Sequence, residues 1–593
     1  MAAKLSLRAT WLCCFLIIGL RMAEVPRYAI SWDVFGYYLY LPATLIHDDV
    51  ALQNHAWLDE LFATYEPSTT QYQVVDAPDG ARVIKYSAGM AVAYAPWFLL
   101  AHALAEPLGF PADGLSPPYQ WIITYGCLLY ILVGLFLFRR VLLHYFSDGW
   151  AAVLILLITC GTNYLHLAAW DGTLLTHPLL FTLFAALLLA TIQWHERPTL
   201  KHALMIGGLL GFITLVRPSE GVVIIVPLLW GLGTSAGRAR KWTLIRAHSL
   251  HLVWAIAAFL IATCPQLIYW HATTGQWLFY SYVNPGEGFD FATPHTLEYL
   301  FSARKGWFLY TPLMAIALLG IIPLHKRLPA LLPALIIYLL VDLWIVSSWS
   351  CWWYAGGSFS ARSMVPTYVF LAIPLGALLS SAWERTRLRW GLSAVVCAAV
   401  ALNLFQTWQW RVGILPHDRV TMEYYAAVFA STSAPNNTEN LLLVDHEASA
   451  INNTRYVRMG ERSQDFDDRS DSTFTLTNET PFSPGIEARY DALTNRDHAV
   501  LRTSARLWIG DSIVAPPTLV MTFQHAGGSY CYRTTTWTIP EGTRNQWVST
   551  NLDYITPEVR ALNDTLKVYV WNQHGGTHRI DDLRVEILER KAD

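Results

Sequence analysis

One carboxylate in this sequence is placed where it could do chemistry. Asp33 lies in ISWDVFGYYLYLP, directly after the first long apolar run, and aromatic residues surround it. A carboxylate at a membrane–water boundary can accept a proton from a bound hydroxyl or amine. Aspartate is also favoured at the N-cap of a helix, and the sequence leaves both roles open.

Several cations lie at the ends of apolar segments, where they are costly unless they pair or reach the interface. They are Lys85 in KYSAGMAVAYAPW, Arg217 in LVRPSEG, Arg304 and Lys305 in FSARKGWF, and Arg362 in GGSFSARSM. Converging cations would suit a phosphate or pyrophosphate group, whereas single ones are commonly headgroup anchors. For Arg217, a salt bridge to Glu220 is the alternative to an anion contact.

Two further segments add candidate substrate contacts. Asp171 and His177 flank a short loop in AAWDGTLLTHPLLF, where His177 is a ligand, an acceptor contact or a buried hydrogen-bonding residue. Trp352 and Trp353 belong to SWSCWWYAGGSFSAR. Their rings suit stacking on sugar rings, but a belt of interfacial tryptophans is equally expected.

These residues are held by a strongly apolar chain. Of 593 residues, 54% are hydrophobic and 14% are charged, against roughly 25% charged in a soluble domain. The net charge of −3 and the lack of basic runs give no reason to expect a nucleic-acid partner. The eight cysteines form no CxxC pair, zinc pattern or disulfide framework. The N-terminus has no small-residue cleavage site, so we interpret it as a retained first helix.

The positions of lysine and arginine predict a polytopic α-helical membrane module over residues 1–410, with about eleven spanning helices. The predicted spans are 8–24, 119–138, 150–168, 174–193, 202–217, 221–235, 250–270, 306–324, 328–348, 364–382 and 390–409. If the apolar run over 85–104 crossed the membrane, the later clusters of lysine and arginine would lie on the outer side. The run is therefore predicted to lie along the outer surface of the membrane. This topology predicts a multi-pass protein of the cell (inner) membrane, with a cytoplasmic N-terminus and a periplasmic or extracellular C-terminal domain.

The C-terminal part is predicted to be an all-β sandwich over 439–593, after a linker over 411–438. Short alternating segments from LLLVDHE to RIDDLRVEIL are separated by turn residues, as in antiparallel sandwiches. The closing strand resembles the last strand of carbohydrate-binding jelly-roll modules. Trp571, Tyr530 and Trp537 are either a sugar platform or core residues, and core is the commoner role on strands.

The order of these features over about residues 5–410 resembles the GT-C superfamily of membrane glycosyltransferases. That superfamily includes protein O-mannosyltransferases and bacterial aminoarabinose transferases. The resemblance is carried by Asp33 after the first helix, two interfacial helices with Lys85 heading the second, and a late aromatic–glycine–arginine segment. The residues of that segment are Trp352, Trp353, Gly356, Gly357 and Arg362.

The resemblance implies a sugar donor linked to a polyprenyl phosphate and a glycan, lipid or protein acceptor, with membrane lipids around both. Asp33 would be the base in an inverting transfer. Lys85, Arg217, Arg304 and Arg362 would contact the lipid phosphate. Many relatives carry paired acidic residues in the first loop, but Val34 follows Asp33 here. Dependence on a divalent metal is therefore open, since a lone carboxylate is a poor site.

Three other classes compete with this interpretation. A transporter or flippase would use the outer charges to line a substrate path, although such proteins tend to carry ionisable residues near the midplane and repeated halves. Here the unusual charges cluster at one boundary of the membrane, only Asp342 is expected well inside a helix, and no half-repeat is evident. An O-antigen polymerase or ligase is a second rival. A membrane anchor for the sandwich is a third, but it needs far fewer helices.

Overall fold

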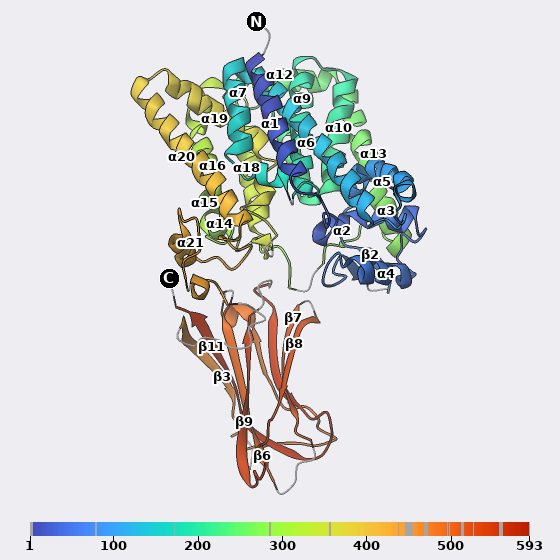
Figure 1. Cartoon of the computed structure of the whole chain (residues 1–593), viewed down its shortest axis with the longest axis vertical. Helices are drawn as coiled ribbons and strands as arrows, with labels where there is room; N and C mark the ends of the chain where they lie inside the picture. Colours follow the sequence, from blue (N-terminus) through green and yellow to red (C-terminus); the bar gives the residue numbers. More distant parts are fainter. Residues whose placement is uncertain are drawn as a thin grey trace. The chain divides into compact units, whose positions relative to one another are not determined.

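A computed structural model describes residues 4–591 except 78–79, 171, 284–285, 355–356, 437, 445–454, 468–471, 495, 497, 511–514, 526 and 557–560. Its contacts divide the chain into two compact units (Figure 1). The first unit comprises Met1–Val283, Thr296–Ser347 and Ser358–His417. The second comprises Asn284–His295, Ser348–Gly357 and Asp418–Asp593.

The first unit is built from helices. Its longer helices are α1 (Lys4–Met22), α5 (Gly89–Ala105), α6 (Pro117–Tyr145), α7 (Asp148–Cys160), α9 (Thr176–Glu196), α10 (Leu200–Val216), α12 (Ser235–Ala247), α13 (Ser249–Thr274), α18 (Leu332–Ser347), α19 (Tyr368–Trp383) and α20 (Thr386–Arg411). Among the described residues, five helices are long and apolar enough to cross a membrane, judged by length and composition: α1, α6, α9, α13 and α20. The chain is therefore a membrane protein, and the count of eleven spans stays a prediction.

Every predicted span overlaps a helix, but three are interrupted. The segment 150–168 breaks at Gly161, between α7 and α8 (Tyr164–Ala169). Within 221–235 the chain forms a 3-10 helix, η2 (Pro218–Ile224), and the short α11 (Ile225–Leu229). The segment 306–324 forms α15 (Trp307–Tyr310), α16 (Pro312–Leu319) and α17 (Ile321–Arg327). Prolines and glycines at these breaks explain the interruptions, because proline removes a backbone donor and glycine weakens a helix.

Helices α10 and α13 pack side by side through two glycines. A Cβ on Gly207 would lie 1.9 Å from the carbonyl oxygen of Ala255, and a Cβ on Gly211 would lie 2.6 Å from that of Phe259. Small residues spaced by four positions allow helix backbones to approach closely, as is common between membrane helices. This contact fixes the position of α10, whose C-cap residue is Arg217.

The first predicted outer loop, residues 25–118, contains more structure than expected. Its two predicted interfacial helices are present, the first as α2 (Trp32–Tyr38) and α3 (Tyr40–Leu45) and the second as α5. The sequence did not predict helix α4 (His55–Tyr65) or the antiparallel hairpin of β1 (Val74–Asp76) and β2 (Arg82–Ile84).

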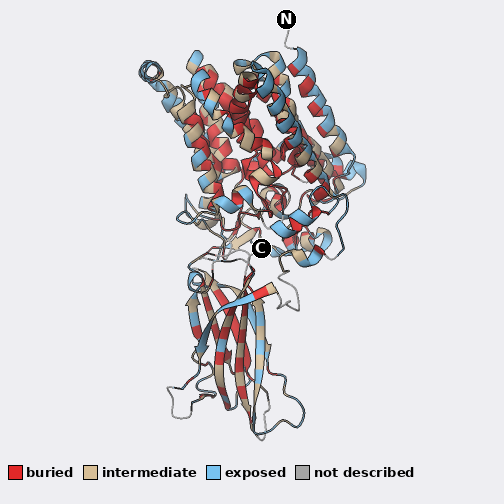
Figure 2. Cartoon of the chain, turned by 90° about the vertical axis from the view of Figure 1, so that its left-hand side faces the viewer, coloured by how far each residue is buried: buried red, intermediate tan, exposed pale blue. Residues whose placement is uncertain are grey.

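The second unit contains two antiparallel sheets packed around one apolar core. The strands are β3 (Tyr456–Gln464), β4 (Phe474–Leu476), β5 (Ile486–Arg489), β6 (Val500–Ile509), β7 (Thr518–His525), β8 (Gly528–Thr536), β9 (Gln546–Ile555), β10 (Thr565–Trp571) and β11 (His578–Arg590). One sheet has the order β5-β10-β7-β8 and the other β3-β11-β6-β9, with β4 beside β11. Buried residues alternate with less buried ones along β6 and β10, as in a sandwich. Figure 2 shows buried residues along the strands of this unit.

The predicted strands from 472 onward are confirmed, but the described part of LLLVDHE, residues 441–444, is not a strand. The sequence also missed β3 and β5. Strand β3 is mostly exposed, so it lacks the alternation of apolar residues on which the prediction depended.

The three aromatic residues proposed as a platform do not share one face. Trp537 is buried in the core and its indole N–H donates to the Val548 carbonyl at 3.0 Å, which confirms the core interpretation. Tyr530 packs against the same core. Trp571 alternates with core residues of β10 and stacks on Phe482, with ring centroids 5.7 Å apart.

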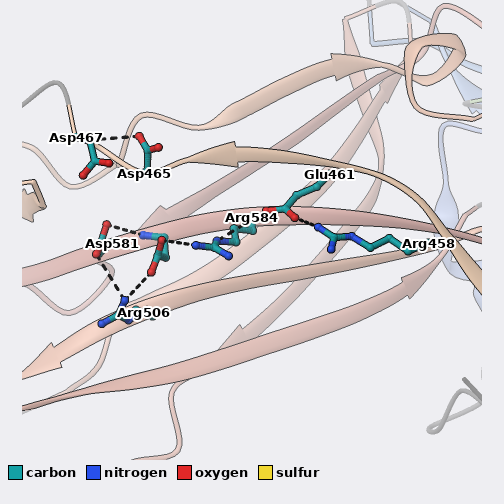
Figure 3. A network of polar contacts seen from close by, with 8 residues as sticks. Arg458, Glu461, Asp465, Asp467, Arg506, Asp581 and Arg584 are labelled. Atoms are coloured by element: carbon teal, nitrogen blue, oxygen red, sulfur yellow. Dashed lines mark hydrogen bonds and ion pairs between the residues drawn. The ribbon is translucent and has the colours of Figure 1, made fainter.

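A network of ion pairs covers the outer face of the five-stranded sheet (Figure 3). Asp582 accepts from Arg506 at 2.6 Å and from Arg584 at 2.7 Å, at a bulge between β11 and β6. Arg458 on the edge strand β3 pairs with Glu461. Charges on an edge strand oppose pairing with other chains, so the network protects an otherwise open edge.

Candidate functional site

Asp33 is held in the first turn of α2 by three hydrogen bonds. Its Oδ2 accepts from Arg362 Nη2 at 2.9 Å, and its Oδ1 accepts from the hydroxyls of Tyr86 at 2.8 Å and Tyr72 at 3.0 Å. The N-cap of α2 is Ser31, so the N-cap interpretation of Asp33 is wrong. The carboxylate instead faces a cation and two phenols.

The hairpin β1–β2 brings the two tyrosines together. Val74 pairs with Ile84, so continuing the register by one more pair on the same face sets Tyr72 opposite Tyr86. The Lys85 N–H donates to the Gln73 carbonyl at 2.9 Å, which continues the ladder beyond the strands. The sequence did not indicate either tyrosine as a site residue, because the strands of the hairpin that positions them have only three residues each.

The surroundings keep Asp33 ionised at neutral pH. Burial raises the pKa of its carboxyl, but the Arg362 guanidinium, the Tyr86 hydroxyl and the Lys85 ammonium together lower the pKa below its ordinary value. A carboxylate has about four acceptor positions, and the three hydrogen bonds fill three of them. Its side chain is 28% exposed, so roughly one acceptor position remains for an incoming hydroxyl.

Lys85 lies in a cage of aromatic rings rather than at the head of α5. Its ammonium is 4.6 Å from the ring centroid of Tyr282, 5.4 Å from that of Tyr72 and 5.6 Å from that of Tyr86. Only 2% of the residue is exposed. Cation–π attraction of this kind orders the tyrosines that hold Asp33.

Gly36 allows the Tyr86 ring to pack against α2. A Cβ on Gly36 would lie 2.2 Å from Cδ2 of Tyr86, a separation that real side chains do not show. Any larger residue must displace the ring, and with it the hydroxyl bound to Asp33.

We expect Gly36→Ala to lower the stability of the chain by about 1–3 kcal/mol, because overpacking forces the buried ring out of place. The matched control is Gly19→Ala in α1, where an added Cβ would meet nothing within 4 Å. Thermal unfolding of both purified variants measures the difference. Equal midpoints for the two variants would contradict the close approach of Gly36 and Tyr86.

Arg217 and His177 form a second part of the same cluster. Arg217 ends α10, and its Nη1 lies 3.4 Å from Nε2 of His177 near the start of α9. Tyr37 lies one turn beyond Asp33 on α2, and burial raises the pKa of its hydroxyl to about 12. The positive charges of Arg217 and Arg362 both act on this hydroxyl and oppose the rise in its pKa. Neither carboxylate oxygen of Glu220 has a hydrogen-bond partner among the described residues, so the salt bridge between Arg217 and Glu220 is not formed.

None of the hydrogen bonds and ring contacts described above links the remaining predicted site residues to the cluster around Asp33. Arg304 is 6% exposed between α14 (Thr296–Phe301) and α15. Its neighbour Lys305 donates to the Ser358 carbonyl and, at 2.5 Å, to the His417 carbonyl, which is a structural role. Trp352 and Trp353 belong to the second unit and are buried, with centroids 5.8 Å apart, as packing residues would be. Asp171 and Gly356 lie outside the described residues.

The described residues contain no group of three or more His, Cys, Asp or Glu that could hold a metal ion. Cations and phenols surround Asp33, whereas calcium or magnesium requires a cage of oxygen ligands.

No protein-family model and no curated protein matches this sequence. Among solved structures, the chain is similar to the arabinosyltransferase EmbB from Mycobacterium smegmatis, determined by single-particle cryo-EM. The identity is 12% and the TM-score 0.30, over 83% of this chain and 59% of that chain. The chain thus spans under two thirds of the length of that structure. What the cluster does has to follow from its own residues.

Proposed function

We propose that the chain is a membrane glycosyltransferase that moves a sugar from a polyprenyl-phosphate donor to an acceptor at the outer face of the membrane, with inversion. The observation that supports this most is Asp33, an ionised carboxylate with about one open acceptor position beside Arg362. A base next to cations is what transfer from a sugar phosphate requires.

In the proposed step, an acceptor oxygen attacks the anomeric carbon of the donor sugar. The new C–O bond forms as the bond between that carbon and the phosphate oxygen breaks. The acceptor proton passes to the Asp33 carboxylate, and the bond electrons leave with the lipid phosphate. Attack on the face opposite the leaving group inverts the configuration at the anomeric carbon.

The leaving phosphate gains negative charge in this step, and cations that face it stabilise that charge. We assign this role to Arg217 and Arg362. Both positive charges act electrostatically on the same two side chains, Tyr37 and His177, so the two guanidinium groups belong to one cluster. Lys85 is enclosed by tyrosine rings, so we propose that it supports the base. Arginine is well suited to the phosphate role because its planar fork matches two phosphate oxygens.

A transfer assay tests this function. The purified chain in lipid nanodiscs is incubated with polyprenyl-phosphate sugars, including hexose and pentose donors, and with candidate glycan, lipid and peptide acceptors. We expect a product with at least one donor, whose anomeric configuration is opposite to that of the donor. Retention of configuration would contradict the inverting mechanism.

One observation favours the alternative of a transporter or flippase. Glu220 lies in η2 and Asp342 on α18, and each residue is 1% exposed. Both have a carboxylate oxygen without a hydrogen-bond partner among the described residues. Buried acids of this kind are typical of substrate or proton paths. Flux of a lipid-linked sugar in proteoliposomes, with no transfer product from any donor, would establish the transporter.

A further inference from the structure

A cavity of about 250 Å³ opens in the first outer loop, beside the segment that carries Asp33. The aromatic residues Tyr28, Trp32 and Tyr65 line it, together with Arg27, Glu66 and Gln120. The ring-bearing residues remain accessible: Tyr28 is 77% exposed and Trp32 is 53% exposed. The cavity thus presents aromatic side chains to the outside.

The backbone around this cavity is strained and held in place. Trp32 has φ of +51° and Glu66 has φ of +44°, in the left-handed region that non-glycine residues seldom adopt. The Trp32 N–H donates at 2.9 Å to the carbonyl of Pro67, the residue that follows Glu66. Gln73 holds the Trp32 carbonyl from the other side at 3.2 Å. Strain of this kind clusters at functional sites, and a tryptophan that only anchors the chain at an interface does not need it.

The wall of the cavity is fixed as well. Gln120 at the head of α6 accepts from the Ile30 N–H at 2.8 Å and donates to the Leu115 carbonyl at 3.2 Å. The Tyr65 hydroxyl donates to Asp113. These bonds set the distance between the segment 27–32 and the end of α4, so the cavity is largely formed before a ligand arrives.

The lining chemistry selects the ligand. The cavity is smaller than the roughly 300–1,000 Å³ of pockets for drug-sized ligands, so it suits a single ring. Aromatic faces favour the apolar face of that ring. Arg27 and Glu66 offer a donor and an acceptor of opposite charge, and neither side chain has a hydrogen bond or ion pair among the described residues. A neutral ring that carries many hydroxyls satisfies all three conditions.

The cavity is lined by Trp32, the residue next to the base in the sequence. Trp32 precedes Asp33, and its ring centroid lies 6.5 Å from that of Tyr72, whose hydroxyl binds the Asp33 carboxylate. We propose that this cavity binds one sugar ring of a glycan acceptor, stacked on Trp32, and presents its hydroxyl to Asp33. The acceptor role rests on the proposed transferase function, whereas the binding of a sugar ring does not.

Binding without turnover tests the inference. The full chain in nanodiscs is titrated with free tetraoses of glucose, mannose, galactose and arabinose, and binding is followed by saturation-transfer NMR. We expect at least one tetraose to bind the native chain and Trp32→Gly to weaken that binding at least tenfold. Glycine accepts the φ of +51° without strain, so this variant removes the ring and keeps the backbone.

Three further variants sharpen the result. Trp32→Phe should restore much of the binding, and Tyr28→Ala should weaken it without an effect on folding, because Tyr28 is largely exposed. Trp277→Ala is the control, since Trp277 is 58% exposed but does not line the cavity. No binding by the native chain, or equal binding by Trp32→Gly, would overturn the inference. Binding without transfer from any donor would support the sugar site and remove the transferase.

Discussion

Replacing Asp33 by asparagine is expected to lower the transfer rate of the chain by about 10²–10⁴-fold, the usual contribution of a general base. Asparagine has nearly the same shape but cannot take the acceptor proton. The hydroxyls of Tyr72 and Tyr86 still find an oxygen to which they can donate. Donor binding should change much less than the rate, because the variant leaves Arg217 untouched and removes only the ion pair between Arg362 and Asp33.

The rate is measured with a labelled polyprenyl-phosphate sugar under saturating donor, and donor affinity is measured separately on the same preparation. Asp76→Asn is the matched control, since Asp76 lies in the same segment between α1 and α6 with a side chain 83% exposed. We expect the control to turn over at the native rate. Near-native turnover by Asp33→Asn would remove Asp33 from the role of base, while loss of donor binding would indicate a structural role instead.

Local sequence was enough to single out Asp33, Lys85, Arg217 and Arg362 as candidates, because each is a polar residue at the end of an apolar run. It also located most helices and most strands, since hydrophobic periodicity is a local property. The hairpin β1–β2 was missed because its strands have only three residues each, too short for an alternating pattern to stand out.

The pairing of the site residues could not be predicted. Asp33 and Arg362 are 329 residues apart in the sequence, and only the packing of the helices brings them within 2.9 Å. Lys85 illustrates the same limit of local patterns. Its position suggested an accessible phosphate contact, whereas the cage around it is completed by Tyr282, nearly 200 positions further along the chain.

We expect Arg362→Met to lower kcat/KM by about 10²–10³-fold, the loss seen when one donor to a developing anion is removed. It should also move the pH profile. Arg362 is the strongest of the groups that lower the pKa of Asp33 against the effect of burial, so its removal raises that pKa. Because the ionised carboxylate is the active form, the acidic limb of kcat/KM should shift to higher pH, and activity should be lost earlier as the pH falls.

The shift of the acidic limb separates two explanations for a slow Arg362→Met variant. If Arg362 contacts only the phosphate, the rate falls at every pH and the limb stays in place. If Arg362 also sets the charge state of Asp33, the acidic limb moves to higher pH. Arg362→Lys keeps the charge but loses the planar fork, so its limb should shift less than that of Arg362→Met. Arg411→Met is the control, because it breaks the ion pair to Glu24 within the same unit and leaves the cluster around Asp33 intact. An unmoved limb in Arg362→Met would therefore show that the tyrosines and Lys85 suffice to keep Asp33 ionised.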